Sequence, residues 1–175
     1  YQLNLNAKKW VNENLKFKST IYSRKTEADY DSSASKEEAV TADNTMYAIQ
    51  TSVEQKTMNS EDELTFHYHN YDRKYNIQGK KDIYYSESLV AKGEKKLNYN
   101  KKLSFGYGGE YKYDWGHFDK KSWVEQTRGH VKNFGIFANA GFKFNDDQIL
   151  SIYSRSDDHN TTGENQTYKV NFLQY

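Results

Sequence analysis

The stretch "LSFGYGGEYKYDWG", residues 103–116, shows how this chain distributes its apolar side chains. Its odd positions carry large apolar or aromatic residues, namely Leu103, Phe105, Tyr107, Tyr111, Tyr113 and Trp115. Its even positions carry small or charged residues, namely Ser104, Gly106, Gly108, Glu110, Lys112 and Asp114. Because successive side chains of a β-strand point to opposite faces, the stretch predicts a strand with one apolar and one polar face. A β-sandwich and a membrane-spanning β-barrel both contain such strands, so the alternation alone does not separate them.

Composition excludes two classes of protein. The 175 residues are 35% hydrophobic, and no stretch approaches the roughly 20 consecutive apolar residues that a membrane-spanning helix needs. The 25 basic residues are balanced by 24 acidic ones, so the chain lacks the basic surface typical of nucleic-acid binders. A helical membrane protein is excluded, and nucleic acid is not an expected partner.

The chain contains neither cysteine nor proline. Without cysteine it can form no disulfide and no thiolate metal site. Proline removes a hydrogen-bond donor from a strand ladder, so its absence, together with 16 tyrosines, favours long uninterrupted strands. The first residues already alternate, with Leu3 and Leu5 between asparagines, and no signal peptide precedes them. We therefore expect residues 1–175 to be part of a larger domain.

The same alternation recurs about nine times along the chain. The alternating segments are residues 3–6, 15–22, 47–54, 64–69, 83–91, 103–116, 133–144, 148–155 and 166–172. Most of them run for about 8 to 12 residues, which is close to the length of a tilted strand that crosses the hydrocarbon layer of a membrane.

The connections between these segments separate the two folds. Tight polar connections lie at 12–15, 59–62, 97–100 and 145–148, and long polar ones at 28–45, 72–82, 115–131 and 156–166. Short and long connections alternate, as in outer-membrane barrels, whereas sandwich connections have no reason to sort in this way. The sequence therefore predicts an all-β fold: a segment of an antiparallel, up-and-down transmembrane β-barrel with about nine strands, short periplasmic turns and long outer loops. The apolar faces would meet lipid, and the polar faces would meet the water-filled lumen.

Residues 149–172, "ILSIYSRSDDHNTTGENQTYKVNF", resemble the barrel of TonB-dependent outer-membrane receptors. The residues that carry the resemblance are Arg155, Asp157, Asp158, His159, Gly163, Thr167 and Lys169. The segments "NFGIFANAGFKF" and "LSFGYGGEYKYD" also look like strands of that family. The resemblance implies a transporter of the bacterial outer membrane for a scarce nutrient such as a siderophore or vitamin B12. Such receptors have a plug domain and about 22 strands, so residues 1–175 are expected to be a partial barrel domain that lacks the plug and the remaining strands.

The expected partners follow from this resemblance. They are outer-membrane lipid, a nutrient bound at the outer loops, and a TonB complex that acts only through a plug not present here. No cofactor and no enzymatic activity are expected. Two alternatives remain open: a passive porin or structural outer-membrane barrel, and a soluble carbohydrate-binding β-sandwich.

Five residues in the expected outer loops are candidate ligand contacts. Trp115, His117 and Trp123 follow a strand, and exposed aromatic residues on loops commonly contact ligands. Anchoring at the membrane interface is the alternative role for these aromatic residues. Asp157 and His159 lie in the last expected loop, where clustered oxygen ligands would suit Ca²⁺. The family resemblance instead implies that Asp157 has a structural role.

Other polar pairs are better explained as parts of a lumen wall. His67 and His69 lie on one face and could share a metal ion, but no third ligand is near them in the sequence. Glu110 and Asp114 could act as paired carboxylates in glycoside hydrolysis, but Lys112 lies between them on the same face. We expect no metal site and no catalytic site here. Glycines at 106, 108 and 109 lie within a strand and not in a phosphate-binding turn, so we expect them to relieve crowding.

Overall fold

A computed structural model describes residues 1–31, 39–77, 80–120, 125–145 and 147–174. All regular secondary structure in this part of the chain is β-strand. The strands are β1 (Gln2–Trp10), β2 (Leu15–Asp31), β3 (Ala39–Lys56), β4 (Ser60–Ile77), β5 (Lys80–Asn98), β6 (Leu103–Lys120), β7 (Glu125–Lys143), β8 (Gln148–His159) and β9 (Gly163–Gln174). Within the described ranges, no helix is long and apolar enough to span a membrane.

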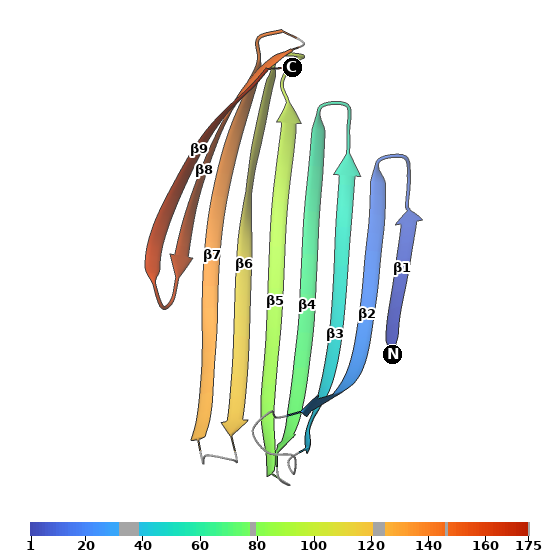
Figure 1. Ribbon diagram of the computed structural model, residues 1–175. Coiled ribbons are helices and arrows are strands. Elements are labelled where there is room, and N and C mark those ends of the chain that lie inside the picture. Colours follow the sequence, from blue (N-terminus) through green and yellow to red (C-terminus); the bar gives the residue numbers. More distant parts are fainter. Residues whose placement is uncertain (32–38, 78–79, 121–124, 146, 175) are drawn as a thin grey trace.

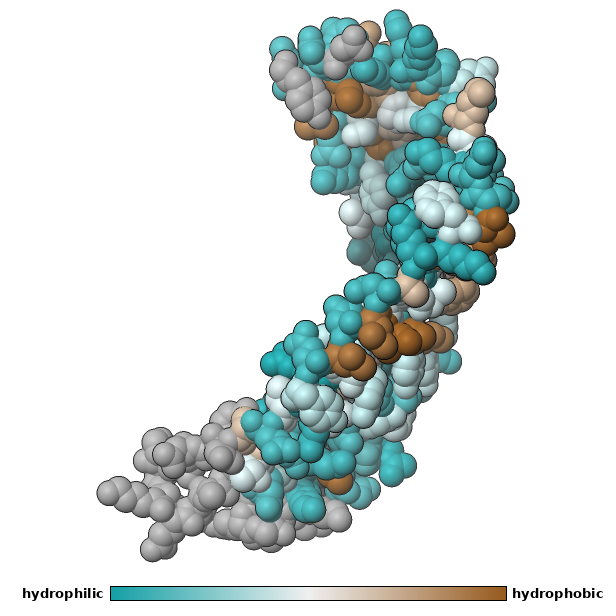
Figure 2. All heavy atoms as spheres, turned by 90° about the vertical axis from the view of Figure 1, so that its right-hand side faces the viewer, coloured by the Kyte–Doolittle hydropathy of each residue, from teal (hydrophilic) through white to brown (hydrophobic). Residues whose placement is uncertain are grey.

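The nine strands form one antiparallel sheet in which each strand pairs with its neighbours in the sequence (Figure 1). The order runs from β1 to β9 without a crossover, so β1 and β9 are its two edges. Viewed from the side of β1, the molecule is a curved slab (Figure 2). This is the predicted up-and-down arrangement of nine strands, present as an open wall and not as a closed ring.

The strands extend well beyond the alternating segments found in the sequence. Strands β2 to β7 have 17 to 19 residues each, and they include most of the residues that we expected in long connections. The predicted bounds of those connections, 28–45, 72–82 and 115–131, are therefore wrong, although residues 32–38, 78–79 and 121–124 lie outside the described residues. The connection expected at 156–166 narrows to three residues between β8 and β9. Alternation fades in the extensions because charged residues there also lie on the apolar face, as Asp43 of β3 and Lys74 of β4 do.

The tight turns at the other end of the strands are stabilised by polar side chains. In three of them an asparagine carbonyl accepts backbone N–H groups within the turn: Asn12 from Asn14 and Leu15, Asn100 from Lys102 and Leu103, and Asn145 from Asp147. Thr57 Oγ1 accepts the N–H of Ser60 in the fourth. Asparagine is favoured in turns for this reason, and these four turns lie at one end of the sheet (Figure 1).

The strand register gathers the apolar side chains on one face, which we call the apolar face. Among its members, Phe134 and Ile136 are each 54% exposed, Phe66 is 47% exposed and Leu64 is 44% exposed. In the described part of the chain only two hydrophobic residues, Ala42 and Phe137, are buried, and both lie on the opposite, polar face. No second layer covers the apolar face within the described residues, so the β-sandwich alternative is wrong.

The polar face is the concave one. The buried polar residues Ser52, Asp82 and Ser88 lie on it, as do Ala42 and Phe137. A curved sheet crowds the side chains on its inner side and spreads those on its outer side. The distribution of buried residues therefore places the polar face inside the curve and the apolar face outside it.

The large apolar residues of the apolar face form a band, which includes Tyr47 to Val53 on β3 and Leu89 to Leu97 on β5. This apolar band crosses the sheet obliquely. On β1 it begins at Leu3, which is level with Tyr47 of β3, whereas on β9 it begins at Tyr168, which is level with Gln55 of β3. The band thus moves by about one residue for each strand. With a rise of about 3.3 Å per residue and a strand spacing of about 4.8 Å, this shift corresponds to a strand tilt of about 35°. Strands of transmembrane barrels are tilted by about 35–45°.

Candidate functional site

Charged side chains line the concave, polar face of the sheet. A cluster around Arg155 joins three strands. The Arg155 guanidinium donates from Nε and Nη2 to the two carboxylate oxygens of Asp157, at 2.7 Å each, and from Nη2 to Glu110 Oε1 at 3.0 Å. Asn133 Nδ2 donates to Asp157 Oδ1 at 3.2 Å. This bidentate geometry is the strongest form of a side-chain ion pair, so the cluster holds β6, β7 and β8 in register.

A glycine makes room for this cluster. A Cβ atom at Gly135 would lie 2.5 Å from Asp157 Oδ1 and 2.7 Å from Arg155 Nη2. Any other residue at this position would displace the ion pair. The sequence therefore places a glycine on β7 directly beneath the paired side chains of β8.

Three glutamates form a row across the concave face. Glu54, Glu63 and Glu94 are level on β3, β4 and β5. Lysines flank the two ends of the row: Lys16 and Lys18 pair with Glu54, and Lys92 and Lys96 lie 3.0 and 3.5 Å from Glu94. The side chains of Glu54 and Glu94 are 24% and 16% exposed, so these pairs remain in contact with water. The result is a partly exposed wall of mixed charge on the concave face.

Phe137 is the large apolar side chain that lies on this polar wall. It is 8% exposed and lies opposite Gly108, where a Cβ atom would be 2.6 Å from the Phe137 ring and 2.3 Å from the Gly93 carbonyl oxygen. The Lys92 ammonium lies 5.4 Å from the centre of the ring, and the Tyr153 ring stacks against it at 6.3 Å. The expectation that glycine relieves crowding is confirmed at Gly108.

His67 and His69 lie side by side on the polar face of β4. The rings of His67 and His69 lie edge to face with centroids 5.5 Å apart. Within the described residues, no group of three or more His, Cys, Asp or Glu side chains is placed to hold a metal ion.

Comparison with solved structures places this sheet among outer-membrane barrels. The RagAB peptide importer in its closed-closed state aligns over 97% of the chain with a TM-score of 0.74 at 11% identity. The outer membrane transporter YddB from Escherichia coli aligns over 95% with a TM-score of 0.76 at 10% identity. The siderophore receptor PirA from Acinetobacter baumannii aligns over 99% with a TM-score of 0.60 at 12% identity.

The chain has the fold of an outer-membrane barrel wall. The chain spans only 29%, 28% and 38% of the length of these three matched chains. The resemblance to TonB-dependent receptors is thereby confirmed at the level of the fold. No protein family model and no curated protein matches the sequence.

The predicted ligand residues do not lie together in outer loops. Trp115 and His117 lie within β6 and not in a loop, and both belong to the apolar face beyond the apolar band. The Trp115 ring packs edge-on against Tyr85 at 5.2 Å, and His117 Nδ1 accepts a hydrogen bond from Arg128 Nε at 3.2 Å. Trp123 lies outside the described residues. A ligand-binding role for the first two stays a prediction, and their position also fits the interfacial aromatic belt of a barrel.

The other two predicted ligand residues, Asp157 and His159, do not lie next to Trp115 and His117. Asp157 lies on the polar face of the barrel wall, where Arg155 and Asn133 occupy its oxygens. His159 ends β8, and its Nδ1 lies 2.8 Å from the Thr161 hydroxyl in the turn that leads to Gly163. Gly163 has φ +77°, a conformation that favours glycine. These contacts give Asp157 and His159 structural partners, whereas ligand binding by either residue stays a prediction.

The link between Glu110 and Arg155 was not found in the sequence. The two residues are 45 positions apart and lie on strands separated by β7. The only sequence signal is that both fall on the polar parity of their strands. Pairing the strands in register places them in neighbouring rows, so a register prediction would have been needed to join them.

Proposed function

We propose that this chain forms part of the wall of a transporter in the bacterial outer membrane, with lipid against its apolar face and a water-filled passage along its polar face. The neighbours in fold include a peptide importer, an outer membrane transporter and siderophore receptors, which supports a transport role. The cargo would be a scarce nutrient such as a siderophore or vitamin B12, bound at the outward ends of the strands. The proposal assigns the chain no catalytic step.

One observation carries this proposal: the sheet exposes an apolar band on one face, interrupted by the Asp62–Lys95 ion pair, and the row of charged groups lies on the other face. In water an uncovered apolar face of this size would drive association, because exposed apolar patches on soluble proteins rarely exceed a few hundred Å². In a membrane the same face is satisfied by acyl chains, and the backbone groups are satisfied by pairing within the sheet. The strand tilt of about 35° agrees with this placement.

The two edges of the sheet imply how the wall is completed. In the described structure β1 and β9 each have one neighbouring strand, and an unpaired edge within the hydrocarbon layer is very costly. We propose that further strands complete the barrel and that a plug domain couples it to a TonB complex. The share of each neighbour that the chain covers supports this proposal.

A passive outer-membrane channel is the second candidate. The hydrated concave face with its lysine and glutamate pairs would serve a channel equally well. The two functions differ in their need for energy, because a passive channel conducts without a coupled inner-membrane complex.

Fractionation and uptake measurements on the natural full-length protein test the proposal. We expect the protein in the outer-membrane fraction of a bacterial host, and we expect nutrient uptake to stop when a protonophore removes the inner-membrane proton gradient. Uptake that continues after this treatment would favour the passive channel. Recovery of the protein in the soluble fraction would overturn both candidates.

A further inference from the structure

One ion pair on the apolar face reaches into the apolar band: Lys95 lies within the band on β5, whereas Asp62 lies beyond Leu64, the last apolar residue of the band on β4. Lys95 Nζ lies 3.1 Å from Asp62 Oδ1 and 3.3 Å from Asp62 Oδ2, joining β5 to β4. On β5 the band runs from Leu89 to Leu97, so Lys95 is two residues from its centre at Gly93. Charged side chains that face lipid are destabilising, and such residues commonly mark functional sites.

The other ion pairs on this face lie elsewhere. Lys25 pairs with Glu27, and Lys74 with Asp72, on the outward extensions of β2 and β4 where both faces meet water. Within the described ranges, Asp62–Lys95 is the ion pair on the apolar face that reaches into the band. Its position therefore needs an explanation that the other pairs do not.

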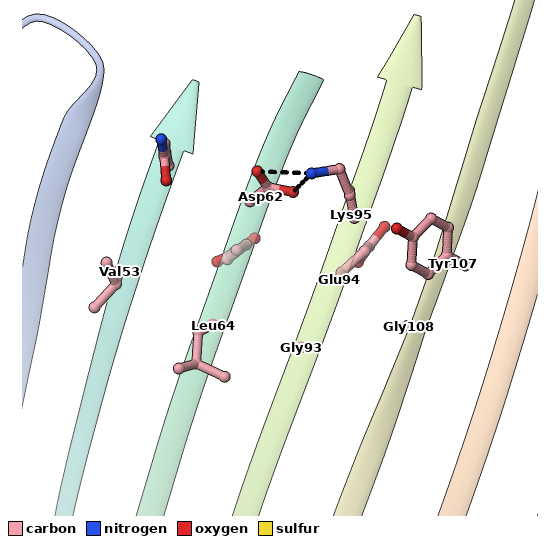
Figure 3. Close-up of a pocket in the computed structure, with 10 residues that line it drawn as sticks. Val53, Asp62, Leu64, Gly93, Glu94, Lys95, Tyr107 and Gly108 are labelled. Atoms are coloured by element: carbon pink, nitrogen blue, oxygen red, sulfur yellow. Dashed lines mark hydrogen bonds and ion pairs between the residues drawn. The ribbon is translucent and has the colours of Figure 1, made fainter. Parts of the chain in front are cut away.

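A groove begins beside this pair. Gly93 has no side chain, and the space above it is lined on the apolar face by Val53, Leu64 and Tyr107 (Figure 3). The groove has a volume of about 420 Å³, and Asp62 and Lys95 form its polar rim. In Figure 3 the Lys95 side chain reaches along the sheet, away from Gly93 and toward Asp62. The rim lies on the side of the short turns, so the groove runs from a charged end toward the centre of the band.

We propose that this groove binds one phospholipid of the periplasmic leaflet whose headgroup carries both a phosphate and a primary ammonium group, as in phosphatidylethanolamine. The inference rests on the proposed outer-membrane location. Lys95 donates to the lipid phosphate, Asp62 accepts from the lipid ammonium group, and one acyl chain lies over Gly93 between Leu64 and Tyr107.

The charge pattern of the rim selects this headgroup. The lysine and the aspartate present one positive and one negative group about 3 Å apart, which matches a headgroup that carries both signs. An anionic headgroup without an amine would place its negative charge beside Asp62 and satisfy only Lys95. A choline headgroup carries a positive charge but has no N–H to donate to a carboxylate. Inorganic phosphate would leave the apolar part of the groove unfilled.

The polar and apolar parts of the groove also follow one another in the same order as those of a lipid. Its polar rim lies toward the turns, and its apolar walls lie toward the middle of the band, so headgroup and acyl chain match them in order. Lipid at the rim would satisfy two charges that otherwise face hydrocarbon. The fit of both parts of one molecule favours a lipid over a protein partner, which would need to supply complementary charges at this depth.

Native mass spectrometry of the natural full-length protein, extracted from the outer membrane and exchanged into micelles that contain equal amounts of three lipids, tests the proposal. The lipids are phosphatidylethanolamine, phosphatidylglycerol and phosphatidylcholine with identical acyl chains. We expect one phosphatidylethanolamine to be retained about tenfold more than either of the others, a ratio that corresponds to about 1.4 kcal/mol. We expect Asp62→Asn to abolish the preference over phosphatidylglycerol, and Lys95→Gln to reduce the retention of all three.

A matched pair of variants separates the groove from the rest of the apolar face. A Cβ atom at Gly93 would lie 3.8 Å from Leu64 Cδ1, an ordinary contact, so the position accepts a side chain and Gly93→Val adds bulk beside the groove. We expect this variant to lose the bound lipid and Ala140→Leu, which enlarges the same face on β7, to keep it. Equal retention of the three lipids by the unmodified protein, or equal loss in both variants, would overturn the lipid site. Recovery of a protein that needs no detergent would instead overturn the proposed function.

Discussion

At the scale of single residues, the concave face depends on close contacts between glycines and larger neighbours. Gly108 lies beneath Phe137, and an added Cβ atom would meet both that ring and the backbone oxygen of Gly93. The ring is able to rotate, whereas the carbonyl oxygen belongs to a paired strand. The backbone contact therefore makes the position intolerant of any side chain.

Replacing Gly108 by alanine is expected to lower the free energy of unfolding by about 2 kcal/mol or more, because overpacking forces the strands apart. The measurement is urea unfolding of the natural full-length protein in detergent micelles. Gly129→Ala on β7 is the matched control, because no atom lies within 4 Å of its added Cβ. Equal stability of the two variants would show that Gly108 is not constrained in this way.

Arg155 organises the cluster that joins β6, β7 and β8. Arg155→Ala would leave Asp157 and Glu110 without their guanidinium, so we expect a loss of about 1–2 kcal/mol in the free energy of unfolding. The control is Lys112→Ala, because the pair with Asp114 is more exposed, at 45% and 34% of the two side chains, and should cost less than about 0.5 kcal/mol. Equal losses would mean that the bidentate geometry adds no stability.

At the scale of the strand, the two faces of each strand differ in what they tolerate. Ile49 and Gln50 are adjacent near the middle of the band on β3, and both are exposed, with Ile49 on the apolar face and Gln50 on the polar face. Ile49→Arg should cost about 2–4 kcal/mol in vesicles, because it places a charge in hydrocarbon, whereas Gln50→Arg should cost close to none. Unfolding in lipid vesicles measures both. A similar cost at the two positions would contradict the assignment of the faces.

The number of strands and their faces could be predicted from the sequence, whereas their ends could not. Alternation marks a strand only where its two faces differ in polarity, as at Leu64 and Thr65 in the band. Beyond the band the apolar face also carries charged residues, so Asp43 and Lys74 carry no signal that they lie in paired strands. The wrongly placed connections arose from this loss of contrast.

The candidate site was only partly predictable for a related reason. Arg155 and Asp157 were found because they are two positions apart in a familiar stretch. Glu110 and Lys95 were not linked to their partners, because contacts between strands depend on register, and register comes from the pairing of whole strands. Trp115 was placed in a loop because β6 extends past the alternating stretch.

At the scale of the whole molecule, an open sheet with two edges is not expected to be stable alone. The 175-residue chain expressed by itself would present unpaired β1 and β9 edges and an uncovered apolar face. We expect it to aggregate or to form mixed oligomers in detergent, as measured by size-exclusion chromatography with light scattering. A stable monomer in detergent would show that these strands can close without others. A stable monomer in water would contradict the membrane assignment.

The central claim is that the apolar face meets lipid and the polar face meets water. Residues 1–175 contain no cysteine, so once any cysteine elsewhere in the natural protein is replaced, single cysteines for nitroxide labels can be placed along β7 from Phe134 to Phe142. Electron paramagnetic resonance in lipid vesicles then measures the access of oxygen, which concentrates in lipid, and of a water-soluble nickel complex. We predict high oxygen access at the even positions and high nickel access at Asn139, which lies on the polar face outside the Arg155 cluster and away from buried Phe137. Labels at even positions that neither reagent reaches would show a buried protein core, and this result would contradict the account.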